Sequence, residues 1–180
     1  MPRDTRVPPL ASDGVFAVTG SSVINAPPDK VWHTLMDFQS YGEWNPFVRG
    51  QRLVDASGRT STSQTPSEGQ FLDISPVHLP PTMGNPGLFG KNSAFVEITV
   101  LDTENYRAAW ETAGPVPAWL LHSERWQTLT TLPDGKTRYD TIEVFSGFAA
   151  YLVQLFVGSA LKKGFQAMAD TLKERAERQE

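Results

Sequence analysis

Residues 120–178 read LLHSERWQTLTTLPDGKTRYDTIEVFSGFAAYLVQLFVGSALKKGFQAMADTLKERAER, and this stretch decides the fold. Asp134-Gly135 separates two runs of alternating polar and apolar residues, which is a strong signal for a β-hairpin. From Ala149 to about Arg178 the period changes to that of an amphipathic helix. Its predicted apolar stripe consists of Leu152, Phe156, Ala160, Phe165, Met168 and Leu172. The order predicts antiparallel strands followed by one long helix that packs on them.

The residues before this stretch add more strands and one short helix. Residues 27–38 are predicted to be helical, because prolines fit the first helical turn and Val31 and Leu35 share one face. Further strands are predicted over 15–24, 47–54, 70–74, 93–101 and 106–112. A sheet of this length must twist and curl. We therefore predict an α+β fold, a curved antiparallel sheet wrapped around a long C-terminal helix, with a short N-terminal helical segment.

The length of 180 residues suits one domain. We predict a disordered N-terminal tail over residues 1–13, which are polar and rich in proline, and a single domain over 14–180. Residues 56–67 are rich in Ser, Thr and Gly and are expected to form a mobile connection. Residues 76–92 combine prolines with apolar side chains, and two interpretations stay open, a lid over a pocket or a cover for a sheet edge.

The composition excludes several classes of function. The net charge of −4 gives no basic surplus for nucleic acid. Without cysteine, the chain has no disulfides, thiolate nucleophile or thiolate metal site. The three histidines lack metal-ligand spacing, and no nucleotide-binding motif occurs, so we predict no metal and no cofactor. No apolar run is long enough for a membrane span, and no secretory signal is visible, so a cytoplasmic location is expected. Five Trp and ten Phe supply aromatic residues for a core or a ligand pocket.

Two segments resemble the SRPBCC (START-like) superfamily, which includes polyketide cyclase/dehydrase-like proteins. The first is Val23–Phe47, with its Ala26-Pro27-Pro28-Asp29-Lys30-Val31-Trp32 opening and its Tyr41-Gly42-Glu43-Trp44-Asn45-Pro46-Phe47 turn. The second is Phe145-Ser146-Gly147 followed by the helix that carries Gly164-Phe165. The resemblance covers about residues 15–175. It implies a helix-grip fold with a deep hydrophobic cavity, and it transfers no catalytic residue.

The faces of the hairpin can be predicted from its turn. A two-residue Asp134-Gly135 turn would pair Pro133 with Lys136. One face would then carry His122, Glu124, Trp126, Thr128, Tyr139, Thr141, Glu143 and Phe145. The other would carry Ser123, Arg125, Gln127, Leu129, Arg138, Asp140, Ile142 and Val144. We assign the first face to the cavity because it holds the aromatic residues.

That assignment yields candidate catalytic residues. Glu124, Glu143 and His122 would face an apolar interior, where burial raises the pKa of a carboxyl toward neutrality and makes it a suitable general acid or base. Alternatively, the two glutamates pair with arginines at the outer surface of the sheet. The candidate ligand-binding residues are Trp110, Trp126, Thr141, Phe145, Tyr106 and Phe89. His33 is expected to face solvent, and His78 is a possible lid residue.

Three functional hypotheses follow. The favoured one is a cofactor-independent cyclase, dehydratase or isomerase that acts on a polyketide-like or aromatic molecule. The second is a non-catalytic carrier or sensor of a lipid or aromatic metabolite, and the third is an interaction protein with a filled interior. Gly158 and Gly164 each weaken a helix interior, which suggests that the backbone approaches the sheet or a ligand closely there. The sequence gives no prediction of oligomeric state.

Overall fold

The computed structural model describes residues 6–178. Its elements, in chain order, are η1 (Ala11–Asp13), β1 (Phe16–Ile24), α1 (Pro28–Met36), η2 (Phe38–Ser40), α2 (Tyr41–Trp44), β2 (Gln51–Val54), β3 (Phe71–His78), β4 (Lys91–Asp102), β5 (Arg107–Thr112), β6 (His122–Thr131), β7 (Thr137–Ser146) and α3 (Ala150–Arg178). The proline-rich segment 76–92 is thus shorter than predicted as a loop, because its first residues extend β3 and its last two begin β4.

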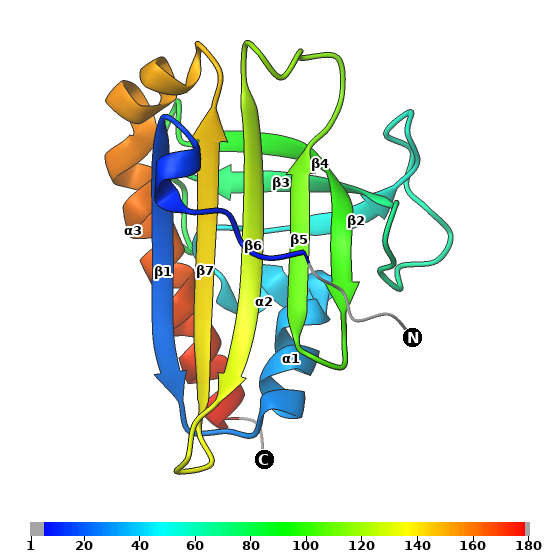
Figure 1. The fold of residues 1–180 in the computed structure, drawn as a ribbon, viewed down its shortest axis with the longest axis vertical. Coiled ribbons are helices and arrows are strands. Elements are labelled where there is room, and N and C mark those ends of the chain that lie inside the picture. The colour runs from blue at the N-terminus through cyan, green and yellow to red at the C-terminus, as the bar shows by residue number, and fades with distance from the viewer. Residues whose placement is uncertain (1–5, 179–180) are drawn as a thin grey trace.

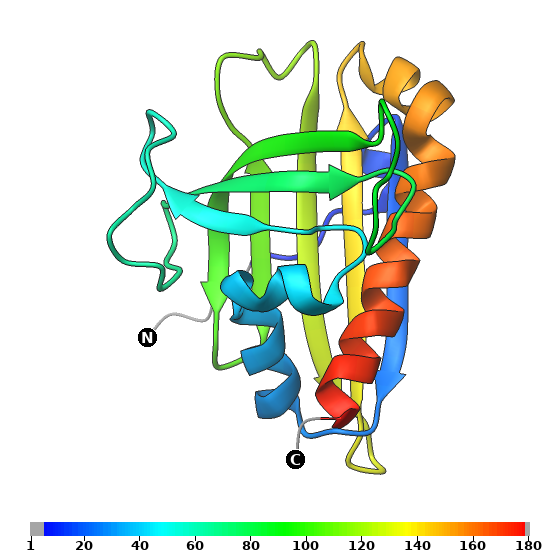
Figure 2. The same ribbon diagram turned by 180° about the vertical axis from the view of Figure 1, so that it is seen from behind.

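The seven strands form one antiparallel sheet in the order β1-β7-β6-β5-β4-β3-β2. The sheet curls strongly, so that β3 and β4 run across the molecule while β1, β6 and β7 run along it (Figures 1 and 2). The long helix α3 lies in the concave side and follows β1 along its length (Figure 2). The predicted α+β helix-grip fold is confirmed.

Close backbone approach fixes α3 on the sheet. A Cβ atom added at Gly20 of β1 would lie 2.5 Å from the carbonyl oxygen of Phe165, and one added at Gly164 would lie 2.4 Å from the Phe47 ring. Ser22 and Lys173 add side-chain hydrogen bonds between the two elements, because Ser22 donates to the carbonyl of Ala169 and Lys173 to that of Val23. The close approach expected at Gly164 occurs, but its partner is the Phe47 ring in the turn after α2 and not the sheet. A Cβ atom added at Gly158 would meet no protein atom closer than 3.8 Å, so α3 does not approach the sheet closely there, and an approach to a ligand stays a prediction.

The predicted apolar stripe of α3 holds only in its C-terminal half. Phe165, Met168 and Leu172 are buried there, together with Leu161, Ala169 and Ala176. In the N-terminal half, Leu152 and Phe156 point to solvent instead, because the helix turns Val153 and Val157 toward the sheet. The apolar pattern failed here because both sides of this half-helix are apolar, so the period did not identify the inner face.

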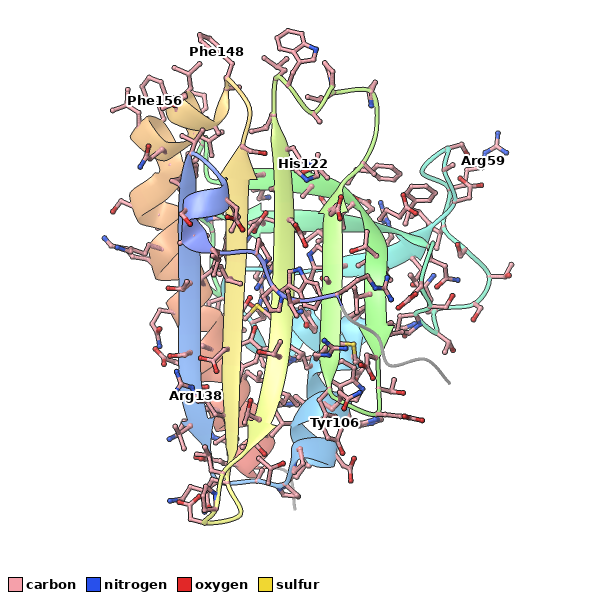
Figure 3. The ribbon with its side chains drawn as sticks, viewed as in Figure 1. Arg59, Tyr106, His122, Arg138, Phe148 and Phe156 are labelled. Atoms are coloured by element: carbon pink, nitrogen blue, oxygen red, sulfur yellow. The ribbon has the colours of Figure 1, made fainter. Side chains whose placement is uncertain are left out.

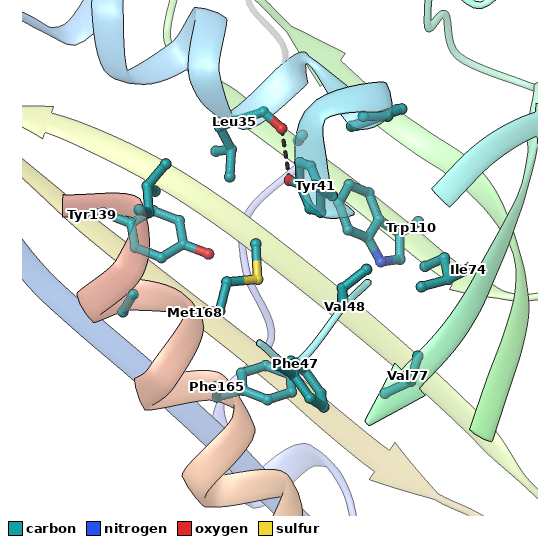
Figure 4. Close-up of a cluster of buried hydrophobic side chains, with 14 of the residues drawn as sticks. Leu35, Tyr41, Phe47, Val48, Ile74, Val77, Trp110, Tyr139, Phe165 and Met168 are labelled. Carbon is teal, nitrogen blue, oxygen red and sulfur yellow. Dashed lines mark hydrogen bonds between the residues drawn. The ribbon is translucent and has the colours of Figure 1, made fainter. Parts of the chain in front are cut away.

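Part of the core lies at the end where α1 and α2 close the sheet (Figure 4). Tyr41 and Tyr139 are fully buried, and the Tyr41 hydroxyl donates to the carbonyl of Leu35 at 2.7 Å. The Tyr139 hydroxyl donates to Oε1 of Gln127 at 2.7 Å, also deep in the interior. Asn45 fixes the turn that follows α2, because its Oδ1 accepts hydrogen bonds from the backbone N–H groups of Phe47 and Val48. The opposite end of the sheet is left for a cavity.

The N-terminal segment crosses the outer face of the sheet (Figure 1). Arg6 contacts Glu68 at 2.9 Å, and its carbonyl accepts a hydrogen bond from Arg107. Residues 1–5 of the predicted disordered tail lie outside the described residues, so the disorder of residues 1–13 stays a prediction. Arg6 and Val7 border the same small hollow as Trp126, which is 2% exposed. This segment therefore covers a small apolar cluster on the outside of the sheet.

Candidate ligand cavity

A cavity of about 570 Å³ lies between the concave sheet and the N-terminal half of α3. Its walls come from the turn after α2, from β3 to β7, from the loop between β5 and β6, and from α3. The lining residues are Phe47, Val48, Ile74, Val77, Leu79, Asn92, Ser93, Ala94, Phe95, Val96, Trp110, Thr112, Ala113, Pro115, Val116, Leu121, Ser123, Arg125, Glu143, Phe145, Val153, Val157 and Leu161. The volume falls in the range typical of small-molecule sites, and the lining is mostly apolar.

Two charged side chains interrupt the apolar wall. Arg125 of β6 and Glu143 of β7 are directly paired positions and lie on the same face of the sheet. Within residues 6–178, Arg125 does not bond to that carboxylate: its Nε donates to Oγ1 of Thr141 at 3.3 Å and its Nη2 contacts the sulfur of Met168 at 3.2 Å. Its guanidinium carbon lies 4.2 Å from the centre of the Phe165 ring. Arg125 is thus a buried cation held by weak neutral partners.

Burial raises the pKa of the Glu143 carboxyl above its ordinary value, and the nearby Arg125 guanidinium and Ser123 side chain oppose that rise in part. Burial dominates because a carboxylate loses hydration in a mostly apolar wall. A carboxyl group whose pKa is shifted toward neutrality can both release and accept a proton under physiological conditions. The arrangement therefore offers one proton-transfer group and one fixed cation in a pocket for apolar molecules.

The structure corrects the predicted faces of the hairpin. The turn is a three-residue Pro133-Asp134-Gly135 loop, in which Gly135 takes a φ of +79° and Leu132 pairs with Lys136. Odd-numbered residues of β6 therefore pair with odd-numbered residues of β7, as in Ser123 with Phe145, and even-numbered residues pair with even-numbered ones. The predicted two-residue turn joined even with odd, so it combined the outer face of β6 with the inner face of β7.

Glu124, Trp126 and His122 consequently point away from the cavity, and their predicted orientation is wrong. The Trp126 indole N–H donates to Oε1 of Glu124 at 2.5 Å on the outer face. His122 lies on the same face, with Nε2 3.7 Å from a carboxylate oxygen of Glu111 (Figure 3). Trp126 misled the assignment because it is buried under the N-terminal segment, outside the sheet.

The other candidates divide between the cavity and elsewhere. Trp110 and Phe145 line the cavity with Glu143. Thr141 is on the inner face, but it is buried beneath the wall, where it donates to the carbonyl of Trp126 at 2.8 Å. Tyr106 lies in the β4–β5 turn at the far end, where its hydroxyl donates to Asp29 (Figure 3). Phe89 is 94% exposed and does not line the cavity.

Sequence reasoning missed Arg125 as a cavity residue. The predicted faces put it on the outer side of the sheet, because a charged residue is rarely buried without a paired acid. In the alternative interpretation it was a counter-ion for glutamates at the sheet surface. The proline before Asp134-Gly135 was the available signal, since Pro suits the second position of a type I turn and so favours the three-residue loop. With that loop, Arg125 shares a face with Tyr139 and Phe145, whose apolar rings belong inside.

His78 and His33 take no part in the cavity. His78 is buried at the end of β3, where its Nδ1 lies 2.8 Å from the carbonyl oxygen of Thr82. This contact holds the first turn of the loop that follows. His33 is exposed on α1, as the helical pattern predicted.

A curved antiparallel sheet that grips a C-terminal helix around an apolar cavity defines the START-like class of hydrophobic-ligand-binding folds. Within this class, the chain belongs to the family described as "Polyketide cyclase / dehydrase and lipid transport", whose sequence pattern matches residues 15–177. The predicted superfamily is confirmed.

Known relatives agree with this placement. The chain is 27% identical to oxopyrrolidines biosynthesis cluster protein O of Penicillium oxalicum, over 92% of this chain and 88% of that protein. The Zhui aromatase/cyclase of Streptomyces sp. R1128 is similar in structure, with a TM-score of 0.67, 16% identity, and coverage of 90% of this chain and 93% of that one. A START superfamily protein of Mycobacterium smegmatis has a TM-score of 0.58 and 14% identity over 90% and 97% of the two chains. At these identities the structural likeness establishes the fold.

Proposed function

We propose that this protein binds a small, largely apolar carbonyl compound of polyketide-like or aromatic type and catalyses its cyclisation, dehydration or isomerisation without a cofactor. The observation that carries the proposal is that Glu143 and Arg125 occupy directly paired strand positions on one wall of an otherwise apolar cavity. The name of the Streptomyces neighbour, an aromatase/cyclase, supports the same chemistry for this fold.

Each side chain has a defined role in the proposed reaction. The ionised Glu143 carboxylate removes a proton from the carbon next to a substrate carbonyl, and the electron pair moves to the carbonyl oxygen as an enolate. The Arg125 guanidinium stabilises that negative oxygen, an interaction that the low-polarity surroundings strengthen. Protonated Glu143 then returns the proton, either to carbon in an isomerisation or to a departing hydroxyl group, which leaves as water in a dehydration. The apolar wall holds the substrate and excludes bulk water.

The test is proton exchange at the α-carbon of a cyclic ketone fused to an aromatic ring. 2-Tetralone in D₂O is followed by NMR with wild-type protein, Glu143→Gln and the matched control Glu124→Gln, while displacement of a bound apolar dye measures binding. We expect Glu143→Gln to slow enzyme-dependent exchange by about 10²-fold or more, the usual range for a general base, with binding retained. Glu124→Gln should exchange at the wild-type rate, because Glu124 lies outside the cavity. Equal exchange rates in all three proteins would reject the catalytic proposal.

A second candidate is a carrier of an acidic apolar metabolite. The observation that favours it is Arg125, a buried cation without a bonded carboxylate partner among the described residues, which suits the acidic group of a ligand. Native mass spectrometry of the purified protein separates the two functions, because a carrier retains its ligand unchanged, whereas an enzyme given substrate releases a product of different mass or isomeric form.

A further inference from the structure

The N-terminal half of α3 is apolar on the side that faces away from the protein. Tyr151, Leu152, Leu155 and Phe156 are exposed, and Phe156 reaches 77%. Phe148, directly before the helix, is 73% exposed and lies at the same end of the molecule (Figure 3). A helix that is apolar on all sides is normally covered on all sides. Among residues 6–178, nothing covers this face.

Two loops extend the apolar surface around the cavity mouth. The loop between β5 and β6 exposes Val116 and Trp119, and the loop between β3 and β4 exposes Leu88 and Phe89. All three segments also border the cavity, through Val153 and Val157 of α3 and through residues at the base of each loop. We call this surface the apolar rim; it comprises Leu88, Phe89, Val116, Trp119, Phe148, Tyr151, Leu152, Leu155 and Phe156.

The segments that supply the rim carry no charged residues, and lysines follow two of them. The ranges 79–90, 112–121 and 144–161, which supply the rim, contain no Asp, Glu, Lys or Arg. The first charged residues after two of these ranges are Lys91 and the pair Lys162-Lys163, and all three lysines are exposed. The net charge of the whole chain is −4, so the positive charge of these lysines is opposite in sign to that of the chain. The range 112–121 is instead flanked by Glu111 and Glu124, so the basic border lies on the sides of β4 and α3. On those sides, the uncharged apolar surface is complementary to an anionic lipid surface.

We propose that the apolar rim docks on the surface of a membrane that contains anionic lipid, and that the cavity exchanges its ligand directly with the bilayer. Trp119 and Tyr151 combine an apolar ring with a polar group, which suits the boundary between headgroups and acyl chains. Lys91, Lys162 and Lys163 would contact the headgroups. No helix in the described range 6–178 is long and apolar enough to cross a bilayer, so the contact is peripheral.

A second copy of the chain fits the rim less well. A two-fold contact through this face would bring the Lys162-Lys163 pair of one copy toward that of the other, and like charges repel. The rim is also made of three separate segments around an opening, which suits a soft surface better than a rigid one. Self-association is therefore the alternative that the experiment must be able to detect.

Trp119 provides a direct reporter. It is 72% exposed, whereas Trp32, Trp44, Trp110 and Trp126 are 2–9% exposed. Aqueous acrylamide will therefore quench mainly Trp119. We expect vesicles of phosphatidylcholine with about one-third phosphatidylserine, an anionic lipid, to shift its emission to the blue and protect it from quenching. Sedimentation with the same vesicles measures the bound fraction.

Paired variants test the two parts of the rim. Leu155→Gln/Phe156→Gln should weaken binding to the mixed vesicles by about tenfold or more, because two large apolar side chains no longer insert. Lys162→Glu/Lys163→Glu should weaken binding to the anionic vesicles by at least about tenfold and leave the weak binding to pure phosphatidylcholine unchanged. The control is Val23→Gln, an exposed apolar residue at the far end of β1, which should bind as wild type.

If the wild-type protein binds neither type of vesicle, or if analytical ultracentrifugation shows a dimer that Leu155→Gln/Phe156→Gln dissociates, the rim does not serve a lipid surface. Exchange at 2-tetralone is measured in solution without vesicles. Its outcome therefore tests the proposed catalysis separately from the docking.

Discussion

The Arg125 guanidinium and the Glu143 carboxyl come from directly paired positions of β6 and β7 and line the same wall of the cavity. The cation rests on the Phe165 ring, at 4.2 Å, instead of bonding to the acid. The acid is thus close enough for Arg125 to lower its pKa in part, yet burial keeps that pKa above the ordinary value. This balance has a measurable consequence for stability.

The protein should become less stable as pH rises, because of Glu143. Its pKa is raised in the folded protein, so the folded state holds the proton more tightly than the unfolded chain, whose glutamate has the ordinary pKa of about 4.5. The free energy of unfolding therefore decreases as pH rises from this value to the raised pKa, by about 1.4 kcal/mol for each unit of the rise. Glu143→Gln removes this loss. Urea unfolding of both proteins from pH 4 to pH 8 should show the variant gaining stability relative to wild type as pH increases; a constant or opposite difference would contradict the shift.

The Tyr139–Gln127 pair should matter for stability rather than for binding. Tyr139→Phe leaves Oε1 of Gln127 without its buried donor, and Nε2 of Gln127 already lacks a partner. We expect a loss of about 1–3 kcal/mol in the free energy of unfolding, the cost of an unsatisfied buried polar group. In a double-mutant cycle with Gln127→Leu, Tyr139→Phe should cost less than it does alone. An equal cost in both backgrounds would mean that this hydrogen bond contributes nothing.

Two glycines of α3 should respond in opposite ways to the same change. Gly164→Ala places a methyl group 2.4 Å from a Phe47 ring carbon, so we expect destabilisation by about 1–3 kcal/mol from overpacking. Gly158→Ala meets nothing closer than 3.8 Å and should gain up to about 1 kcal/mol in helix propensity. Thermal unfolding of the two variants under one buffer condition provides the measurement. The pair controls for the chemistry of the substitution, and equal effects would show that Phe47 does not define the packing.

A large side chain in the cavity should block ligand binding. Val157→Trp introduces an indole from the helix side into the space of about 570 Å³. We expect the affinity for an apolar fluorescent dye to fall by about tenfold or more because that space is filled, with a stability cost of no more than about 3 kcal/mol. Dye titration measures the first effect and urea unfolding the second. Unchanged dye affinity in a folded variant would place the ligand site elsewhere.

The fold could be predicted because its signals are local. The Asp134-Gly135 turn, the alternating runs and the long helical segment each follow from backbone geometry, and together they leave little choice of fold class. The boundaries were less certain where two signals conflict. Residues 76–78 continue β3 although Pro76 normally argues against a strand, because the sheet has an irregular register at this point.

The site could be predicted only in part. Glu143, Trp110 and Phe145 were expected in the cavity and line it, whereas Glu124, His122 and Trp126 were expected there and lie outside. The difference arises because the turn has three residues and not the predicted two. One extra residue changes which face of β6 lies on the same side of the sheet as a given face of β7. An aromatic residue identifies a buried position, but it does not say which side of the sheet buries it.

The sequence by itself determined the α+β class, the helix that packs on the sheet, and the presence of buried aromatic residues, since these depend on hydrophobic periodicity and turn residues along the chain. Only the tertiary structure decided that Arg125 lies beside Glu143, that the N-terminal segment buries Trp126 on the outside, and that the first half of α3 exposes its apolar side. These three relationships depend on which distant segments come into contact. A local pattern fixes the shape of an element, but its partners are chosen by the packing of the whole chain.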